Sequence, residues 1–326
     1  MLESTLPQPA SPEDLEQHRP ALRAHCYRML GSPFDAEDAV QETLTRAWRN
    51  RQRFEARSAL GSWLYRIATN VCLDMLKSNQ RRARPMDLGP AREPVAANLH
   101  VPDEARWIEP IPNAWLTAGE DPADVAVTRE SVRLALVAAL QHLPARQRAT
   151  LILFEVLRWE AREIAELLET TVPAVNSSLQ RARATLARRG LSPTDRASAL
   201  SPADRELLDR YAAAFERYDI QGLTALIRED AIQSMPPYDM WLAGRADIFA
   251  WWLGPGIGCR GSRLLPTPGA NGSPAFGQYK PSPAGGYEPW ALQVLELSDG
   301  RIAELTFFLD TPRLFPLFGL PARIDA

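Results

Sequence analysis

The stretch TVPAVNSSLQRAR, residues 171–183, decides how the first half of this chain is interpreted. At helical spacing it predicts a buried stripe of small and apolar side chains on one side of a helix: Ala174, Val175, Leu179, Ala182 and Leu186. The opposite side carries Asn, Ser, Gln and Arg. A solvated helix face usually mixes Glu with Lys, whereas this one continues to Arg189 without an acidic residue. The face therefore favours a negatively charged partner.

The composition predicts a soluble protein of more than one domain. The 326 residues exceed the usual size of one domain, and 45% hydrophobic with 24% charged content is typical of globular proteins. No run approaches the roughly 18 apolar residues of a membrane helix, and the N-terminus lacks the features of a secretory signal. We expect a cytoplasmic protein that does not bind a membrane.

The three cysteines, Cys26, Cys72 and Cys259, are widely spaced and form no C-x-x-C pair. This spacing argues against a zinc site and against a disulfide framework. We expect neither a metal nor a cofactor.

Charge is unevenly distributed, although the net charge is only −3. Residues 40–84 hold 10 basic against 3 acidic side chains, and residues 128–189 hold 10 against 6. Between them, residues 87–124 hold 2 against 8, and residues 201–326 hold 11 against 15. Two basic blocks thus flank an acidic stretch, and an acidic domain follows.

The periodicity of the first part is helical. Asp35 is expected to cap one helix, and a second is expected from about Ala59 to Arg82. Residues 85–125 are rich in proline and acids and are typical of a linker, but Trp107, Ile108 and Trp115 are unusual for a free one and are expected to dock.

The last part has a mixed pattern. Ser201 followed by Pro202 predicts the start of a helix. Asp299-Gly300 joins two apolar runs and predicts a hairpin within a curved antiparallel sheet. These signals predict an α+β fold from Ser201 onward.

The helix that contains the opening stretch and the one before it have the proportions of a helix-turn-helix. In that motif the second helix enters the major groove, where Arg, Gln, Asn and Ser side chains suit base edges and phosphates. The candidates on the exposed face are Asn176, Ser177, Gln180 and Arg181. The alternative is an amphipathic helix with a basic, solvated face.

A second basic block interleaves aromatic residues, among them Trp63 and Tyr65, with arginines that include Arg57 and Arg66. Aromatic rings can stack on unpaired bases while arginines hold phosphates. The alternative is that the aromatic residues belong to the core and the arginines are merely solvated.

Three stretches in this order resemble regions 2 and 4 of bacterial sigma factors of the extracytoplasmic-function type. They are DAEDAVQETLTRAW (35–48), FEARSALGSWLYRIATNVCLDMLKSNQRR (54–82) and HLPARQRATLILFEVLRWEAREIAELLETTVPAVNSSLQRARATL (142–186). The resemblance covers residues 13–84 and 128–189. It implies core RNA polymerase and promoter DNA as partners, and it leaves a separate anti-sigma factor open.

The resemblance also implies roles for particular residues. Core polymerase is expected to be gripped by one group: Asp38, Gln41, Glu42 and Arg46. The −10 element is expected to be captured and melted by a second group: Arg57, Ser58, Ser62, Trp63, Asn70, Asp74 and Arg81. The −35 element is expected to be read by the candidates above together with Arg183, which joins Ser177, Gln180 and Arg181 in matching the family's recognition helix. For the polymerase group, the alternative is an ordinary solvated face.

The implied organisation has four parts. A region 2 domain spans 11–86, an acidic linker 87–125, and a region 4 helix-turn-helix domain 126–190. The linker resembles a segment that threads the polymerase's RNA channel, where its net negative charge would mimic nucleic acid; the alternative is a plain tether. Residues 201–321 resemble a SnoaL-like domain, a cone-shaped α+β fold. The predicted fold class is therefore two all-α domains followed by an α+β cone.

The SnoaL-like tail carries none of the four histidines, so a histidine base is not expected there. Its candidate pocket residues are Tyr238, Asp239, Trp241, Arg245 and Asp310. We expect no catalytic residue, and we expect a domain that regulates the sigma factor in cis, with a small-molecule ligand as a candidate partner. The sequence leaves two alternatives open: a ligand-responsive DNA-binding regulator that works without polymerase, and a SnoaL-like enzyme with an N-terminal regulatory part.

Overall fold

The computed structural model describes residues 11–53, 60–78, 81–116, 132–188 and 200–325. Contacts divide the chain into two compact units. The first unit comprises Met1–Arg82 with Ile108–Arg196, and the second comprises Ala83–Trp107 with Ala197–Ala326. The expected linker is thus shared between the two units. Ile108, only 2% exposed, is buried as the docking prediction requires.

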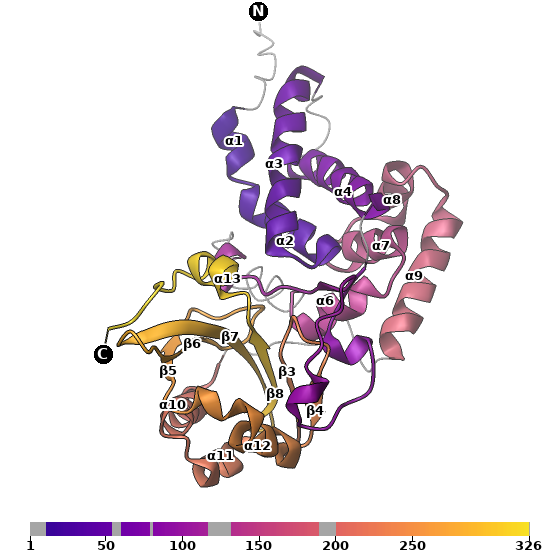
Figure 1. Ribbon diagram of the computed structural model, residues 1–326. Coiled ribbons are helices and arrows are strands. Elements are labelled where there is room, and N and C mark those ends of the chain that lie inside the picture. Colours follow the sequence, from indigo (N-terminus) through magenta and orange to yellow (C-terminus); the bar gives the residue numbers. More distant parts are fainter. Residues whose placement is uncertain (1–10, 54–59, 79–80, 117–131, 189–199, 326) are drawn as a thin grey trace, which may run out of the picture. The chain divides into compact units, whose positions relative to one another are not determined.

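The first unit begins with four helices and a short 3-10 turn (Figure 1): α1 (Pro12–Glu16), α2 (Arg19–Leu30), α3 (Pro33–Asn50), η1 (Arg51–Arg53) and α4 (Leu60–Ser78). The cap predicted at Asp35 is wrong. Ser32 caps α3, because its hydroxyl accepts a hydrogen bond from the Asp35 backbone N–H at 3.3 Å. The Asp35 carboxylate instead accepts from Arg82 Nη2 at 2.7 Å. Arg82 lies beyond the end of α4, which is shorter than predicted.

The helical bundle buries a histidine. His25 of α2 is fully buried, and its Nε2 lies 3.0 Å from Thr69 Oγ1 of α4. Because Thr69 Oγ1 already donates to Tyr65 O (2.8 Å), the proton between His25 and Thr69 belongs to His25 Nε2. Burial, assisted by the positive charge of Arg28, lowers the pKa of His25 to about 3. The histidine is therefore neutral in the folded protein.

The rest of the first unit is also helical. Its described residues form the 3-10 turn η4 (Asn113–Trp115) and the helices α6 (Leu134–Gln141), α7 (Ala145–Glu155), α8 (Ala161–Leu167) and α9 (Val172–Ala187). Thr171 caps α9 by accepting from Ala174 N at 3.3 Å, and Pro173 lies in the first turn. Four residues separate α8 from α9, which matches the predicted helix-turn-helix.

Arg148 of α7 joins the two halves of the first unit. Its guanidinium is 3% exposed and donates to Met29 O of α2, to Gln141 Oε1 (2.6 Å), and to Gln141 O and Leu143 O (3.2 Å each). Burial lowers the pKa of Arg148 to about 10. These acceptors are neutral oxygens, so hydrogen bonds rather than an ion pair hold the buried charge.

The second unit combines a mixed sheet with helices of 7 to 16 residues. Its helices and 3-10 turns are η2 (Pro85–Asp87), η3 (Ala96–Asn98), α10 (Pro202–Arg217), α11 (Ile220–Leu226), α12 (Arg245–Leu253), η5 (Pro255–Cys259) and α13 (Thr311–Leu317). Its main strands are β3 (Ile227–Ser234), β4 (Trp241–Ala243), β5 (Arg263–Pro266), β6 (Ala275–Pro281), β7 (Tyr287–Ser298) and β8 (Arg301–Phe308). Two further short strands, β1 (Arg82–Ala83) and β2 (Arg106–Trp107), pair at the ends of the segment 83–107.

The six-stranded sheet has the order β4-β3-β8-β7-β6-β5. The predicted hairpin is confirmed: Ser298 pairs with Arg301, and Asp299 and Gly300 both have positive φ (53° and 67°), as a two-residue hairpin turn requires. The prediction of an antiparallel sheet is confirmed for four strand pairs and is wrong for one, because β3 runs parallel to β8. These two strands are joined by a long connection rather than by a turn.

The helices α10, α11 and α12 lie against one side of the curved sheet (Figure 1). The cap predicted at Ser201 is confirmed, with Asp204 completing a capping box. Between helices and sheet lies an apolar core that includes Tyr211, Phe215 and Trp252. The predicted class of two helical parts followed by an α+β cone is confirmed.

The buried His25 predicts a pH dependence of stability. The unfolded histidine takes up a proton below pH 6.5, whereas the folded one does so only near pH 3. Because the unfolded state then binds more protons, the free energy of unfolding falls as pH falls through 6.5. We expect His25 to account for a loss of about 1 kcal/mol between about pH 7 and about pH 5.5.

Urea unfolding at the two pH values measures this loss. The variant His25→Gln should lose about 1 kcal/mol less than the wild type over the interval, because it has no imidazole to protonate at this position. An equal loss in His25→Gln and wild type would contradict a neutral, buried His25.

Candidate nucleic-acid interface and ligand cavity

The helix α9 packs on α7 and α8 through one face and leaves the other free. Val175, Leu179, Ala182 and Leu186 are buried, as predicted. Ala174 is exposed, so its place in the predicted stripe is wrong: it lies in the first turn, three residues after the cap. The free face presents Asn176, Ser177, Gln180 and Arg181, all exposed.

Arg183 differs from its neighbours on α9. Its Nε donates to Glu155 Oε1 at 2.8 Å, and its guanidinium lies 5.4 Å from the ring centroid of Phe154. Glu155 and Phe154 both belong to α7. Arg183 is therefore engaged in holding α9 on α7, whereas Arg181 contacts only Ser178 Oγ, at 3.5 Å, among the described residues.

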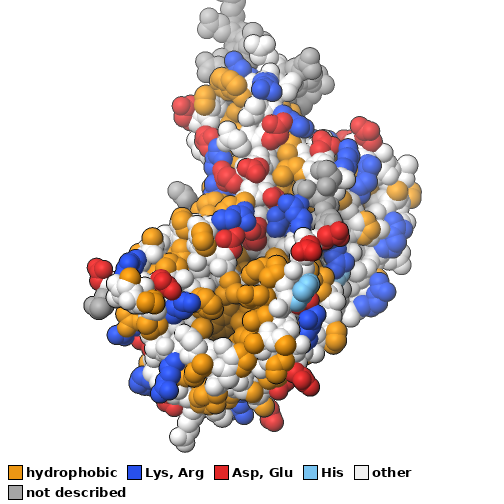
Figure 2. Space-filling view, viewed as in Figure 1, with side chains coloured by type: hydrophobic (Ala, Val, Ile, Leu, Met, Phe, Trp, Pro, Cys, Tyr) orange, Lys and Arg blue, Asp and Glu red, His pale blue; other side chains and the backbone are white. Residues whose placement is uncertain are grey.

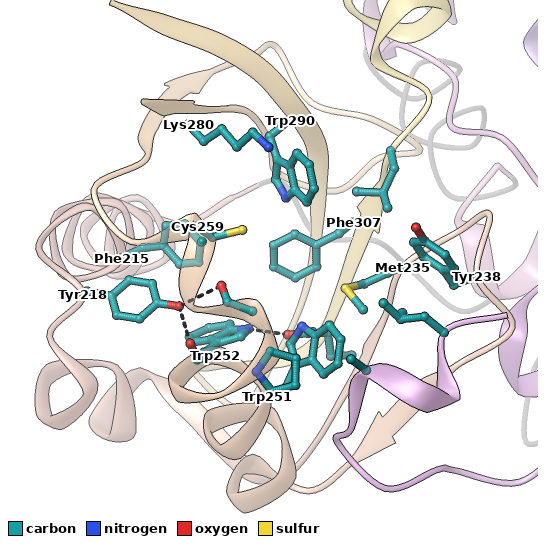
Figure 3. Close-up of a pocket in the computed structure, with 17 residues that line it drawn as sticks. Phe215, Tyr218, Met235, Tyr238, Trp251, Trp252, Cys259, Lys280, Trp290 and Phe307 are labelled. Carbon is teal, nitrogen blue, oxygen red and sulfur yellow. Dashed lines mark hydrogen bonds between the residues drawn. The ribbon is translucent and has the colours of Figure 1, made fainter. Parts of the chain in front are cut away.

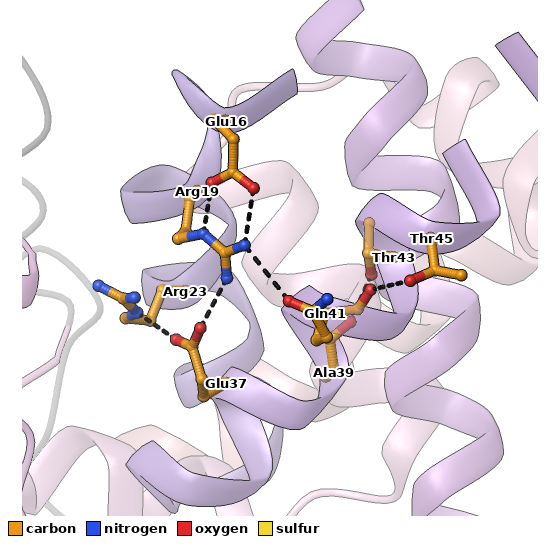
Figure 4. A network of polar contacts seen from close by, with 8 residues as sticks. All are labelled: Glu16, Arg19, Arg23, Glu37, Ala39, Gln41, Thr43 and Thr45. Carbon is orange, nitrogen blue, oxygen red and sulfur yellow. Dashed lines mark hydrogen bonds and ion pairs between the residues drawn. The ribbon is translucent and has the colours of Figure 1, made fainter. Parts of the chain in front are cut away.

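The residues expected to meet polymerase lie along α3. Asp38 and Gln41 are exposed, and Glu42 and Arg46 are half-buried. Figure 4 shows how Gln41 is held: Arg19 donates to its Oε1 (3.3 Å) and also to Glu37 Oε1 (2.6 Å). The α3 surface is thus ordered by ion pairs before any partner arrives.

Arg46 also connects this surface to α4. Its Nε pairs with Glu42 at 2.6 Å, and its Nη1 lies 3.8 Å from Asp74 Oδ2. Asp74 accepts from Lys77 Nζ at 2.9 Å, and this hydrogen bond is the main reason that the pKa of Asp74 lies below its usual value. One network of charges therefore links residues assigned separately to polymerase and to DNA.

The other residues expected at the −10 element differ in solvent exposure. Arg57 and Ser58 lie outside the described residues. Ser62 and Trp63 are half-buried at the start of α4, and Asn70 is exposed on the same helix. Arg81 is exposed and lies 3.5 Å from His142 Nε2.

Two residues of the aromatic and basic block serve packing. The Tyr65 ring meets His25 edge-on at 5.4 Å, and burial is the main cause that raises the pKa of Tyr65. The Arg66 guanidinium lies 5.3 Å from the ring centroid of Trp159 and 3.9 Å from Glu166. For Tyr65 and Arg66, the contacts favour the structural alternative.

The second unit contains a cavity of about 240 Å³. It lies between the sheet, α12 and the segment that contains Ala96 and Leu99. Figure 2 shows a hollow lined by hydrophobic side chains, and Figure 3 shows the rings that surround it. The lining is dominated by aromatic residues: Phe215, Tyr218, Tyr238, Trp251, Trp252, Trp290 and Phe307. The polar lining residues include Gln233, Cys259 and Lys280.

The polar groups of the cavity are held in place. The Gln233 Oε1 accepts from Trp252 Nε1 at 2.8 Å, and the Tyr218 hydroxyl donates to Trp252 O at 2.7 Å. Lys280 Nζ lies 3.8 Å from the ring centroid of Trp290 and 3.9 Å from Glu288 Oε1. Burial raises the pKa of the Cys259 thiol, which keeps it protonated and unreactive near neutral pH.

Of the five residues predicted for a pocket, Tyr238 lines this cavity and four do not. Asp239 pairs with Arg92 at 2.7 Å, and Trp241 donates through Nε1 to Gly89 O at 2.9 Å. Arg245 donates to Thr224 O and Ile227 O, and Asp310 precedes α13 and pairs with Arg313 at 3.3 Å. These four residues serve local structure.

Sequence reasoning missed Lys280, Gln233 and the tryptophans of the lining. The sequence does contain a pattern that indicates one face of a strand, because residues two apart in a strand point to the same side of the sheet. Gln278 and Lys280 of β6 are two residues apart and so share one face. What the strand pattern lacks is the identity of the facing helix, so it does not assemble the cavity.

Within the part of the chain that the structure describes, no helix is long and apolar enough to cross a membrane. Among the same residues, no group of three or more His, Cys, Asp or Glu side chains is placed to hold a metal ion.

Comparison with known proteins relates both halves of the first unit to one family. Residues 15–82 match the model of Sigma-70 region 2, and residues 133–186 match that of Sigma-70, region 4. The chain is 46% identical over 312 residues to the ECF RNA polymerase sigma factor SigG of Mycobacterium tuberculosis, a match that covers 94% of this chain and 82% of SigG.

A second relative is the ECF RNA polymerase sigma factor SigJ of Mycobacterium tuberculosis, 28% identical over 219 residues that cover 67% of this chain and 61% of SigJ. The crystal structure of SigJ superposes with a TM-score of 0.61 at 22% identity and covers 95% of this chain and 98% of that one. This similarity extends the shared fold through the second unit.

The free face of α9 predicts a defined effect on DNA binding. We expect Arg181→Ala to weaken binding of duplex DNA from upstream of the protein's own coding region about tenfold, since a bidentate base contact contributes about 1–3 kcal/mol. Fluorescence anisotropy across a range of salt concentrations measures it. Arg205→Ala removes the same charge from an exposed position of α10 and should leave the affinity unchanged. Equal affinities for the two variants would contradict the assignment of this face.

Proposed function

The chain belongs to the extracytoplasmic-function (ECF) RNA polymerase sigma factors, and from that membership we propose how each of its surfaces works. As a sigma factor it binds core RNA polymerase and promoter DNA and promotes initiation at −35 and −10 elements. The polymerase supplies the chemistry of RNA synthesis. We place this action in the cytoplasm, where transcription occurs.

The free face of α9 carries the assignment most directly. Its four exposed polar residues, Asn176, Ser177, Gln180 and Arg181, stand on a helix without an acidic side chain, opposite a buried stripe. That arrangement suits insertion into the major groove at the −35 element. Arg183 is bound to Glu155, so its role there is to steady the helix or to contact phosphate after leaving that partner.

The first half of the first unit serves polymerase and the −10 element. Asp38, Gln41, Glu42 and Arg46 form the surface of α3 that we assign to the core enzyme. We assign Ser62, Trp63, Asn70, Asp74 and Arg81, together with Arg57 and Ser58 of the loop outside the described residues, to capture and melting of the −10 element. The link from Arg46 to Asp74 would couple the two surfaces.

The packed first unit is the form that is not engaged on a promoter. The −35 and −10 elements lie about 25 base pairs apart, or about 85 Å at a rise of 3.4 Å per base pair. In the first unit α2 contacts α6 and α7, and α4 contacts α7. Helices in direct contact do not span that distance, so the contacts around Arg148 must open when both elements are bound.

The second unit acts as a regulator in cis rather than as an enzyme. No described residue that lines its cavity is Asp, Glu or His, so none of the usual carboxylate or imidazole bases points into it. Asp239, the acid nearest to the lining in sequence, is engaged with Arg92. Residues 83–107 belong to this unit and overlap the expected linker. Through this segment the second unit can restrain the connection between the two sigma regions.

Transcription in vitro with purified core polymerase, on a template containing the protein's own upstream region, tests the assignment. We expect initiation at a defined start with the wild type and a reduction of about tenfold in the double variant Asp38→Ala and Gln41→Ala at limiting protein, since a loss of about 0.7 kcal/mol at each of two interface residues adds to about 1.4 kcal/mol. Asp209→Ala with Gln221→Ala removes the same side chains from exposed positions of the second unit and should transcribe as the wild type does.

The same assay tests regulation in cis when residues 1–195 replace the full chain. A change in transcript yield in either direction supports a regulatory second unit, with higher yield identifying inhibition. Unchanged yield would refute the regulatory role, and absence of a defined start with every form would refute the assignment to this promoter.

A further inference from the structure

The cavity of the second unit has a wall that comes from the linker. Ala96 and Leu99 line it, although every other lining residue lies between Phe215 and Leu309. We call residues 84–100 the strap. A ligand in the cavity would touch the strap and the domain at the same time.

The strap is anchored on both sides of its two lining residues. Before them, Arg92 N donates to Trp241 O (3.0 Å) and Gly89 O accepts from Trp241 Nε1 (2.9 Å). After them, His100 O accepts from Asp239 N (2.9 Å). The strap is therefore fixed to the short segment 239–241, next to the lining residue Tyr238.

Asp239 is the centre of this anchor. Its side chain is 11% exposed, and its Oδ2 lies 2.7 Å from Arg92 Nη2 and 3.6 Å from His100 Nδ1. Its Oδ1 is buried without a hydrogen-bond partner among the described residues. A buried carboxylate oxygen in that state is costly, so the anchor holds the strap without being fully satisfied. Contacts between a ligand and the strap residues that line the cavity would stabilise the docked strap further.

The lining specifies the chemistry of a ligand. Three tryptophans, two phenylalanines and two tyrosines present ring faces and edges, which favour a flat aromatic molecule. Lys280 is a cation at the wall, over the ring of Trp290, and its one carboxylate neighbour, Glu288, lies 3.9 Å away. An ammonium group has three N–H donors, so Lys280 retains capacity for an acidic group.

The volume limits the size of the ligand. A cavity of about 150 Å³ accepts benzene, and this one has about 240 Å³. Two fused rings with one small substituent match that space.

We propose that the cavity binds a small aromatic acid, with its rings among the tryptophans and its acidic group at Lys280, and that the bound acid holds the strap on the second unit. The acid binds more tightly when Ala96 and Leu99 complete the wall, so its binding favours the docked strap by that difference in affinity. An effect of the acid on transcription rests on the proposed regulatory role. A strap that is docked on the second unit is not available to lie along polymerase as part of the linker.

Binding is tested by calorimetry on the full chain with 2-naphthoate and with its neutral analogue 2-naphthamide. We expect Lys280→Met to weaken 2-naphthoate about tenfold and 2-naphthamide by less than about threefold, since only the acid meets the charge. The other lysine of the chain provides the matched control: Lys77→Met should bind both probes as the wild type does. Failure of 2-naphthoate to bind the wild type at millimolar concentration would overturn the ligand class, and equal losses for acid and amide would overturn the role of Lys280.

Coupling to the strap is tested by hydrogen exchange with and without 2-naphthoate. We expect slower exchange at the strap amides of Arg92 and Leu99 when the probe is bound. Leu99→Ser should abolish this protection and weaken the probe, while Val95→Ser, at an exposed strap position outside the lining, should preserve both. Binding without protection of these amides would overturn the coupling. Neither measurement contains polymerase, so a negative result here would overturn the ligand proposal alone. The proposed function as a sigma factor is tested separately by the transcription assay.

Discussion

The packing between the two halves of the first unit depends on the buried guanidinium of Arg148. Arg148 stays protonated near neutral pH, because its pKa of about 10 lies well above 7, so its N–H donors need acceptors once it is buried. The acceptors come from Met29 of α2 and from Gln141 and Leu143 next to α7. They fix region 4 against region 2, while Arg148 Nε remains buried without a partner among the described residues. The contact is thus specific but incompletely satisfied, which suits packing that has to be released.

This packing determines which surfaces remain available. With α7 and α8 covering one side of α9, only its polar, non-acidic face is left exposed, and this is the face that we propose for DNA. On α3, the surface that we propose for polymerase, Arg19 donates hydrogen bonds to Glu37 and Gln41. In the second unit the same principle operates through Asp239, a partly satisfied charge that holds the strap beside the cavity. Both units therefore keep functional segments in place with buried charges whose hydrogen bonding is incomplete.

Much of the local structure could be predicted from sequence, because it depends on residues close together in the chain. The stripe of α9, the cap at Ser201 and the turn at Asp299-Gly300 are of this kind. The predicted cap at Asp35 failed because Ser32, three residues earlier, also favours a helix start, and because the Asp35 carboxylate binds Arg82, 47 residues away. The parallel pairing of β3 with β8 and the cavity were not predicted, for a related reason. Each brings together segments that are far apart in the sequence, and no local pattern connects them. Tyr238 alone was predicted among the residues that line the cavity.

The most direct test of this account is the separation of region 2 from region 4 during promoter binding. Spin labels at Glu13→Cys of α1 and Ala187→Cys of α9, in a chain with Cys259→Ser, allow the distance to be measured by electron paramagnetic resonance, since Cys26 and Cys72 are buried. We predict one distance in the free protein, set by the packing of the first unit. We predict that it increases by tens of ångström with core polymerase and promoter DNA, toward the roughly 85 Å between the elements. A distance that stays unchanged in a transcriptionally active complex would contradict the account.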